Sequence, residues 1–340
     1  MVDDERLMTC MLCHEPCLSA CPVTMATRHH TYAPSRLAQA AWSARRGEVP
    51  WSAIADTLYY CIHCHQCTEA CVYAEAPMEP GSMLLAVRQE MQTAVQHPVV
   101  REAQARAVAP PPLPKGAPGD FLVVADRWAP GAERSLVAVI RALDPRPAVG
   151  YVVDLGWELG LSGADVTRHL ISVGERIAQW PGEVLVAFPR DAVWLNQLIA
   201  KQWGVILDRP VEYFARKIDG RGRVSMAEFA HHVAYHPSRY VTRDLKMGPA
   251  LAEILQVDGN WSWWQPGTPS PGPAIGMDRQ TREALVASLW EDLGDTEFDA
   301  VITDDPYVAE ALRQMARTGQ RIWLVPEWLA IRNLGGVPHA

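Results

Sequence analysis

Two cysteine-rich stretches decide the fold of this chain: CMLCHEPCLSACP at residues 10–22 and CIHCHQCTEACV at residues 61–72. The first reads Cys-x2-Cys-x3-Cys-x3-Cys-Pro and the second Cys-x2-Cys-x2-Cys-x3-Cys. Together they contain all eight cysteines of the 340-residue chain. A short run of thiolates followed by one more cysteine three residues later is typical of a site for a cubane iron–sulfur cluster. Two such runs predict two clusters and a role in electron transfer.

The spacing also predicts which thiolates share a cluster. In such a run, three side chains turn toward one cluster and the fourth points to the other. We therefore expect the two runs to exchange ligands. The predicted ligands of the first cluster are Cys10, Cys13, Cys17 and Cys71, and those of the second are Cys61, Cys64, Cys67 and Cys21.

Three other interpretations of the cysteines are open. Zinc also binds four cysteines, but its ligands are usually split into two pairs separated by a longer loop. Disulfides suit small secreted scaffolds, whereas this chain is long and its charged residues 3–6 leave no apolar leader before the first cysteine. The third interpretation is a single cluster, or one of a three-iron type, because the first motif has an x3 spacing and Val72 replaces a proline after Cys71.

The residues between and after the motifs favour helices. Pro34 suits the first turn and Gly47 the end of a helix over Ser35–Arg46. Trp51–Tyr60 is expected to form a second helix, and Pro80–Val95 a third whose apolar residues recur at helical spacing. No strand-like alternation interrupts this region. The N-terminal part is therefore expected to be all-α.

On these motifs, residues 1–95 resemble the alpha-helical ferredoxin module. That module occurs in the iron–sulfur subunits of anaerobic glycerol-3-phosphate dehydrogenase and glycolate oxidase, and in the C subunit of heterodisulfide reductase. The stretches Cys10–Val23 and Cys61–Val72 carry the likeness. The resemblance implies two [4Fe–4S] clusters that relay electrons between a flavin-bearing subunit and another acceptor.

A change of composition marks a boundary after the helical part. Residues 109–120 read APPPLPKGAPGD, and this run of proline and glycine favours an extended spacer. We predict a ferredoxin domain over 1–98, a proline-rich linker over 99–119, and two α/β lobes over 120–220 and 221–340. The expected fold class is multidomain, with an all-α part followed by two repeated α/β lobes that have mainly parallel sheets.

The lobes are predicted from alternating strands and helices. The expected strands are Phe121–Ala125, Gly150–Leu155, Val184–Phe188, Val205–Leu207, Val233–Tyr235, Ala300–Thr303 and Ile322–Val325. The expected helices are Glu133–Leu143, Val166–Ala178, Asp191–Trp203, one that ends near Leu255, Thr281–Leu293 and Pro306–Arg317. Asp191 suits the N-cap of its helix.

Two short matches, offset by about 115 residues, indicate that the lobes are duplicated. Val184–Ala187 with Asp191 matches Ala300–Thr303 with Asp305. A second match pairs two segments that each follow the last strand of their half, namely Glu212–Ala215 and Glu327–Ala330.

A duplicated α/β unit resembles the paired cysteine-rich (CCG-type) domains that accompany the ferredoxin module in the same group of iron–sulfur proteins, heterodisulfide reductase among them. This chain departs from that pattern, because no cysteine follows Cys71. The resemblance therefore carries no active-site chemistry over to the C-terminal part.

Other candidate sites are weaker. His236, Asp304 and Asp305 follow or end predicted strands and are metal-ligand types, but such residues are commoner as helix caps and loop groups. Residues 261–273, WSWWQPGTPSPGP, read as a tryptophan-rich loop that either contacts a partner or folds its tryptophans beneath itself. No glycine-rich phosphate motif follows a strand, so we predict no nucleotide or flavin site in the chain itself.

Composition limits the partners. The formal net charge of −8 and the pI near 5.8 argue against nucleic acid and anionic membrane surfaces as partners. No apolar run has the length that a bilayer span needs. Reduced cysteines reserved for clusters favour the cytoplasm, with any membrane association made through a partner.

These observations favour an electron-transfer subunit of an oxidoreductase complex, with no active site of its own. Its expected partners are a flavoprotein or other redox subunits. The alternative is an enzyme subunit whose cysteine-free part keeps a substrate or cofactor site. A deep pocket lined by convergent polar groups would favour that alternative.

Overall fold

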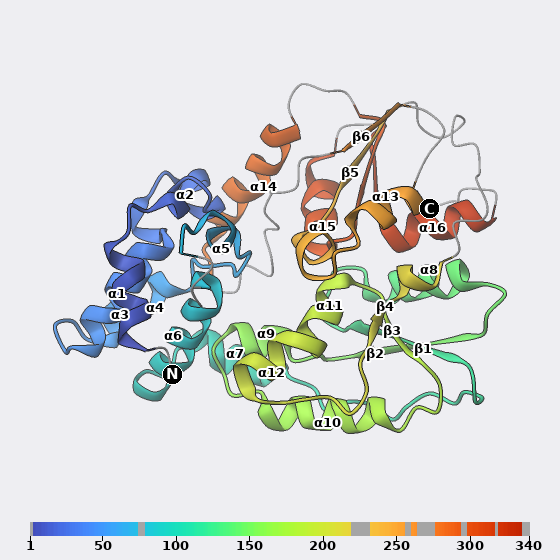
Figure 1. Cartoon of the computed structure of the whole chain (residues 1–340), viewed down its shortest axis with the longest axis horizontal. Coiled ribbons are helices and arrows are strands. Elements are labelled where there is room, and N and C mark those ends of the chain that lie inside the picture. The colour runs from blue at the N-terminus through green and yellow to red at the C-terminus, as the bar shows by residue number, and fades with distance from the viewer. Residues whose placement is uncertain are drawn as a thin grey trace. The chain divides into compact units, whose positions relative to one another are not determined.

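The computed structural model describes residues 3–73, 79–218, 232–255, 260–263, 276–293, 298–316 and 319–334. The chain divides into two compact units. The first, here called the head, comprises Met1–Ala107, Gly156–Val166 and Pro269–Asp292. The second, the tail, comprises Val108–Leu155, Thr167–Thr268 and Leu293–Ala340. Figure 1 shows helices throughout the head and strands in the tail, so the expected mixture of α and α/β structure is confirmed. The domain boundaries at 98, 119 and 220 stay predictions.

The described part of the head contains helices and short 3₁₀ turns. Its helices are α1 (Asp4–Leu12), α2 (Pro22–Thr27), α3 (Pro34–Arg45), α4 (Trp51–Leu58), α5 (Gln66–Ala70), α6 (Pro80–Ala94), α7 (Pro98–Arg106), α9 (Trp157–Leu161) and α14 (Arg279–Leu293). The predicted helices at α3, α4 and α6 are confirmed to within two residues at each end. Proline opens α2, α3, α6 and α7, where its missing N–H leaves no hydrogen bond unmade.

Helix α1 was not predicted, although the sequence contains its start signal. The Asp3 carboxylate caps the helix by accepting a 2.8 Å hydrogen bond from the backbone N–H of Arg6. Asp4 and Glu5 in the first turn favour the positive end of the helix dipole. As a result Cys10 lies on a helix, not in a loop.

One apolar core holds the N-terminal helices of the head together. Its buried members include Leu7, Leu37, Ala38, Ala41, Leu58, Leu84, Val87 and Met91. They come from α1, α3, α4 and α6, so these four helices pack on one another. Burying each large aliphatic side chain contributes about 1.5–3 kcal/mol.

The tail contains two four-stranded sheets. The strands are β1 (Phe121–Asp126), β2 (Ala148–Val153), β3 (Val184–Val186), β4 (Glu212–Tyr213), β5 (His232–His236), β6 (Asn260–Trp263), β7 (Ala300–Thr303) and β8 (Arg321–Leu324). The helices are α8 (Ala132–Leu143), α10 (Thr167–Ala178), α11 (Pro189–Val193), α12 (Ile199–Trp203), α13 (Gly248–Leu255), α15 (Pro306–Met315) and α16 (Val325–Leu334). One π turn, Trp194–Leu198, joins α11 to α12, and another lies at Tyr240–Asp244.

The two sheets repeat one topology. The strand orders are β2-β1-β3-β4 and β6-β5-β7-β8, and every pairing between these described strands is parallel. Because the orders correspond strand for strand, the sheets support the predicted duplication of the lobes. Parallel strands end at the same edge of a sheet, which is where the loops that carry side-chain chemistry gather.

The fourth strand of the first sheet does not lie where it was predicted. Val205–Leu207 forms no strand, and Glu212–Tyr213 forms β4 instead. Val205 is buried whereas Ile206 is 81% exposed, so only part of the apolar run faces the core. The match between Glu212–Ala215 and Glu327–Ala330 was wrong as a structural equivalence, because Glu212 pairs within the sheet whereas Glu327 lies in α16.

The tryptophan-rich stretch is also partly a strand. Asn260–Trp263 pairs in parallel with β5 as β6, so the prediction of a loop from residue 261 was wrong there. The Trp-Ser-Trp alternation matches the two-residue period of a strand. Residues 264–273 lie outside the described residues, and the partner contact inferred for them stays a prediction.

Candidate metal centre

The eight cysteines lie at helix ends and in short loops of the head. Cys10 is within α1, Cys13 follows its end, Cys17 lies in a 3₁₀ turn and Cys21 precedes α2. Cys61 and Cys64 lie in the loop before α5, Cys67 is within α5 and Cys71 follows its end. None of the eight forms a disulfide.

Left-handed residues shape both cysteine loops. Glu15 (φ 57°), His63 (φ 53°) and His65 (φ 60°) adopt the left-handed conformation that side chains other than glycine rarely take. Alternation of right- and left-handed residues turns successive backbone N–H groups inward and forms anion-binding concavities, a device found at many iron–sulfur sites. The backbone N–H of Glu15 donates to the Cys13 Sγ at 3.4 Å.

The environment of Cys10 brings together one of the two predicted ligand groups. Burial raises the pKa of the Cys10 thiol, and the nearby Cys17, Cys13 and Cys71 raise it further. Cys71 is separated from Cys10 by most of the N-terminal region in sequence, yet both border the core of the four packed helices. Burial also raises the pKa of Cys17 to about 11. Buried thiols of raised pKa are held as thiolates when a metal binds them.

Cys67 lies among the other predicted group. Burial raises the pKa of its thiol well above the usual range, and Cys61, Cys64 and Cys21 add to the shift in that order, with Cys17 last. Cys21 and Cys64 also border one small apolar cluster, formed by Val23, Ile62, Met277 and Leu285. Cys17 interacts with Cys21, so the two groups adjoin.

The two groups differ in the charges beside them. Near the first, Glu15 pairs with the Arg36 Nε at 3.1 Å and accepts a 2.9 Å hydrogen bond from the Ser35 hydroxyl. Near the second lies Arg88, which is 1% exposed. Its guanidinium donates to the carbonyls of Leu58 and Cys61. Sequence reasoning missed Arg88, because an arginine within a helical apolar stripe has no local signature.

The histidines of the second motif face different surroundings. His63 is 4% exposed, and burial lowers its pKa well below the usual value. His65 packs on α6, because a Cβ added to Gly81 would lie 2.8 Å from the His65 Nδ1. Helix α6 therefore backs the loop that contains Cys64 and Cys67, and a glycine makes that close approach possible.

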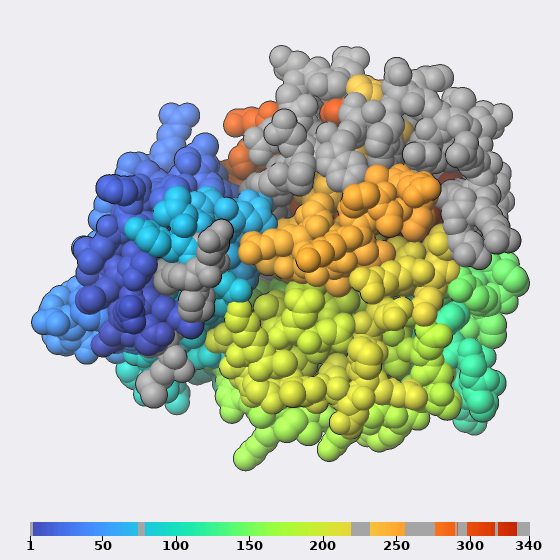
Figure 2. Space-filling view, viewed as in Figure 1, coloured from blue at the N-terminus to red at the C-terminus, as the bar shows by residue number. Residues whose placement is uncertain are grey.

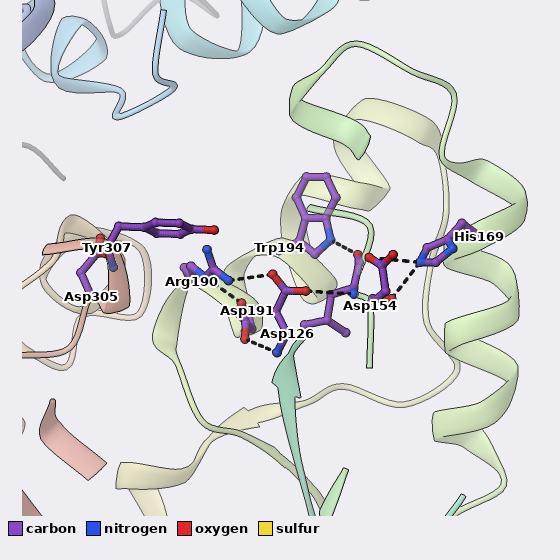
Figure 3. Close-up of polar contacts among 9 residues, drawn as sticks. Asp126, Asp154, His169, Arg190, Asp191, Trp194, Asp305 and Tyr307 are labelled. Atoms are coloured by element: carbon purple, nitrogen blue, oxygen red, sulfur yellow. Dashed lines mark hydrogen bonds and ion pairs between the residues drawn. The ribbon is translucent and has the colours of Figure 1, made fainter. Parts of the chain in front are cut away.

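In the tail, the residues at the carboxyl ends of β1 and β3 form a buried ion-pair network (Figure 3). The Arg190 guanidinium donates to Asp126 at 2.8 Å and to Asp191 at 3.0 Å. Figure 3 shows Tyr307 of α15 on the other side of Arg190, whose guanidinium carbon lies 4.9 Å from the ring centroid. The expected N-cap role of Asp191 was wrong, because it lies inside α11 and accepts from the Asp126 backbone N–H at 3.4 Å.

The second lobe contains a similar set of buried polar groups. Asp304 accepts hydrogen bonds from the Tyr235 hydroxyl at 2.7 Å and the Ser238 backbone N–H at 3.0 Å. Asp305 caps α15 by accepting from the Tyr307 N–H at 2.8 Å. His236 Nδ1 lies 3.3 Å from the Thr303 hydroxyl. The polar atoms of these residues make their contacts with other groups of the same chain.

Within the described ranges, no three His, Cys, Asp or Glu side chains lie close enough to hold a single metal ion. This includes His236, Asp304 and Asp305, so the structure gives no support to a metal site there. The cysteine groups are likewise not gathered around one point. In a cubane, each thiolate would bind a different iron. Eight thiols, three of them buried and five partly exposed, fit that chemistry, and the Cys13 Sγ has a backbone N–H directed at it.

Comparison with known proteins supports an iron–sulfur assignment for the head. A family profile described as a 4Fe-4S dicluster domain matches residues 6–74. No curated protein matches the chain. A solved structure titled as a hypothetical protein from Helicobacter pylori resembles the chain with a TM-score of 0.60 at 10% identity, over 88% of this chain and 68% of that one. At that identity the likeness concerns the fold alone.

The family profile and the positions of the cysteines both indicate an iron–sulfur site in the N-terminal region. Residues 6–74 form a ferredoxin-like module that binds a 4Fe–4S centre, and they give the chain an iron–sulfur electron-transfer role. No helix among the described residues is both long enough and apolar enough to span a bilayer.

Proposed function

We propose that this chain is the electron-transfer subunit of a multi-subunit oxidoreductase and relays electrons through two [4Fe–4S] clusters. The first cluster is held by Cys10, Cys13, Cys17 and Cys71. The second is held by Cys61, Cys64, Cys67 and Cys21. The complex is of the heterodisulfide reductase, glycerol-3-phosphate dehydrogenase or glycolate oxidase type and lies in the cytoplasm.

One observation supports the proposal: the last cysteine of each motif lies near cysteines of the other motif. Cys71 influences Cys10, and Cys21 influences Cys61 and Cys67. This proximity agrees with the proposed sets, in which three cysteines of one motif join the last cysteine of the other. The two sets adjoin through Cys17 and Cys21, and adjoining clusters exchange single electrons.

The hydrogen bonds made by the polar groups of the tail support a non-catalytic role for the tail. Asp126, Asp191 and Arg190 bind one another, and the oxygens of Asp304 are used by Tyr235 and Ser238. Hydrogen-bonded buried carboxylates of this kind fix loops in one conformation. A substrate site needs polar groups that point into open space. The alternative of an enzyme active site in the tail therefore has less support.

Exposed apolar side chains beside the cysteines suggest where a redox partner docks. Leu12 precedes Cys13 and is 73% exposed, and Val72 follows Cys71 and is 71% exposed. Figure 2 shows that the cyan stretch around the second motif reaches the surface of the head. Apolar side chains that form one exposed patch mark protein interaction sites. We propose a flavoprotein subunit as the partner.

Metal analysis and spectroscopy test the proposal. The full chain, reconstituted without oxygen, is expected to contain about eight irons and about eight sulfides. Dithionite should bleach its visible absorption and give the electron paramagnetic resonance (EPR) spectrum of two interacting reduced clusters. Half of these contents, with one non-interacting signal, would contradict the two-cluster relay. Zinc without sulfide would overturn the function as a whole.

A further inference from the structure

Arg88 is a cation without an anionic partner in the interior of the head. It is 1% exposed. Its Nε and Nη2 donate to the Leu58 carbonyl at 3.1 and 2.7 Å, its Nη1 donates to the Leu161 carbonyl at 2.8 Å, and Nη2 also reaches the Cys61 carbonyl. Every hydrogen bond that it makes among the described residues is thus to a backbone carbonyl.

A buried charge of this kind requires compensation. Transfer of an isolated ion from water to a protein interior is strongly unfavourable unless an opposite charge accompanies it. Arginine does not escape the cost by losing its proton, because its pKa stays above the accessible range. Carbonyl dipoles and the Tyr59 ring, whose centroid lies 4.7 Å from the guanidinium carbon, offset only part of the cost.

Close packing of a distant segment encloses Arg88. Gly163 adopts φ +90°, and a Cβ there would lie 3.0 Å from the Arg88 backbone. This close approach brings the segment Gly156–Val166 onto α6, so that the Leu161 carbonyl covers the guanidinium. Water is therefore excluded from a positive charge that lies directly beside the ligand residue Cys61.

We propose that Arg88 is the counter-ion of the second cluster and sets its reduction potential above that of the first. The inference rests on the proposed two-cluster function. Four thiolates give a [4Fe–4S] centre a net negative charge, and taking up one electron adds another. A fixed positive charge in a medium of low dielectric favours the more negative state, so it raises the potential.

The first site lacks such a charge. Among the described residues, Arg36 is paired with Glu15 beside this site, and its side chain is 47% exposed. The asymmetry gives the relay a direction: the cluster held by Cys61, Cys64, Cys67 and Cys21 takes up an electron before its neighbour does. Arg88 is a positioning and tuning residue in this scheme, since it binds the protein and not a reacting group.

Potentiometric titration followed by EPR tests the role of the charge. Arg88→Gln keeps an amide donor for the carbonyls but removes the charge, and it should lower the potential of the second cluster only. Arg88→Lys keeps the charge but loses the forked guanidinium geometry. The reduction potential of its second cluster should stay near the wild-type value. Arg46→Gln removes an exposed arginine of the head, paired with Glu48, and should move neither potential.

Each outcome decides the inference. If the reduction potential of the second cluster is unchanged in Arg88→Gln, the inference is overturned. It is also overturned if Arg88→Lys lowers that potential as much as Arg88→Gln does, because hydrogen bonding to the carbonyls and not charge would then matter. Should Arg88→Gln fail to retain its clusters, the order of reduction in the wild-type protein decides: a first cluster that is reduced before the second overturns it. A wild-type chain that assembles only one cluster defeats the proposed function instead.

Discussion

The Tyr60 hydroxyl donates a 2.7 Å hydrogen bond to the Asp278 carboxylate, although 218 residues separate the two in sequence. Asp278 stands just before α14 and also accepts from the Thr281 backbone N–H at 2.9 Å, so it caps that helix. Hydrogen bonds from Tyr60 and then Thr281 lower the pKa of Asp278 to about 2. One carboxylate therefore starts α14 and ties it to the residue before Cys61.

A double-mutant cycle measures the energy of the hydrogen bond between Tyr60 and Asp278. Tyr60→Phe and Asp278→Asn each remove the hydrogen bond, and their combined effect on the free energy of unfolding should be less than additive by about 0.5–1 kcal/mol. The value is modest because Asp278 is exposed and water screens it. Ser288→Ala removes a hydroxyl that donates to the Leu285 carbonyl within α14; paired with Tyr60→Phe it serves as the control and should be additive. Full additivity in the test pair would show that the bond contributes nothing in solution.

Ligand exchange is tested by two matched substitutions. Cys21→Ser should alter the EPR signal of the cluster held by the second motif and leave the other signal in place, and Cys71→Ser should do the reverse. The reason is that each of these cysteines lies in the field of the opposite group. If Cys21→Ser instead perturbs the cluster held by Cys10 and Cys13, each motif binds its own cluster.

Helix α6 is expected to support the second cluster through His65. Gly81→Val places side-chain atoms where the His65 ring lies, because even a Cβ would approach the Nδ1 to 2.8 Å. Iron release to a chelator should therefore be several-fold faster than in the wild type. Ser82→Val makes the same kind of change at the neighbouring position of α6 and controls for helix propensity. Equal release rates in the two variants would refute the contact.

The buried Asp304 is expected to make the tail less stable as the pH rises. Burial raises its pKa to about 7, so between pH 5 and 7 the folded state holds a proton that the unfolded state has lost. The stability of the wild type relative to Asp304→Asn should then fall by up to about 1.4 kcal/mol per pH unit and level off above pH 7. Urea unfolding at several pH values measures this. A difference that stays constant between pH 5 and 7 would mean that Asp304 is already ionised in the folded chain.

The proposed docking surface is tested by charge insertion. Leu12→Asp combined with Val72→Asp should abolish co-purification of the flavoprotein, because a desolvated charge at the centre of an interface is strongly unfavourable. Ile206→Asp alters an equally exposed apolar side chain of the tail, 81% exposed, and should have no effect. Loss of the partner in Ile206→Asp alone would move the interface to the tail.

Several helices and strands could be predicted from patterns of neighbouring residues in the sequence. Proline and apolar spacing predicted α3, α4 and α6, and buried apolar runs predicted β1, β5 and β7. Helix α1 was missed although Asp3 and its acidic neighbours signal it. The alternation in Asn260–Trp263 was hidden by the prolines and glycines that follow.

Long-range relationships could not be predicted in this way. Nothing local distinguishes Asp191 as an ion-pair partner from Asp191 as a helix cap, because that depends on Asp126 and Arg190 meeting in the fold. The same holds for Arg88, whose partners include the distant Leu161. The ligand grouping rests on cluster chemistry, which constrains cysteine spacing, and it stays a prediction.

The composition of the head has a consequence for biosynthesis. Its apolar cluster beside Cys21 and Cys64 needs Met277 and Leu285, and its cover over Arg88 needs Leu161. A ribosome makes the cysteine motifs first and these segments much later, while domains generally fold as they emerge. The apolar cluster beside Cys21 and Cys64 therefore stays incomplete until α14 has been translated. Cluster insertion is thus expected on finished chains, and nascent chains that stop before α14 should emerge without iron.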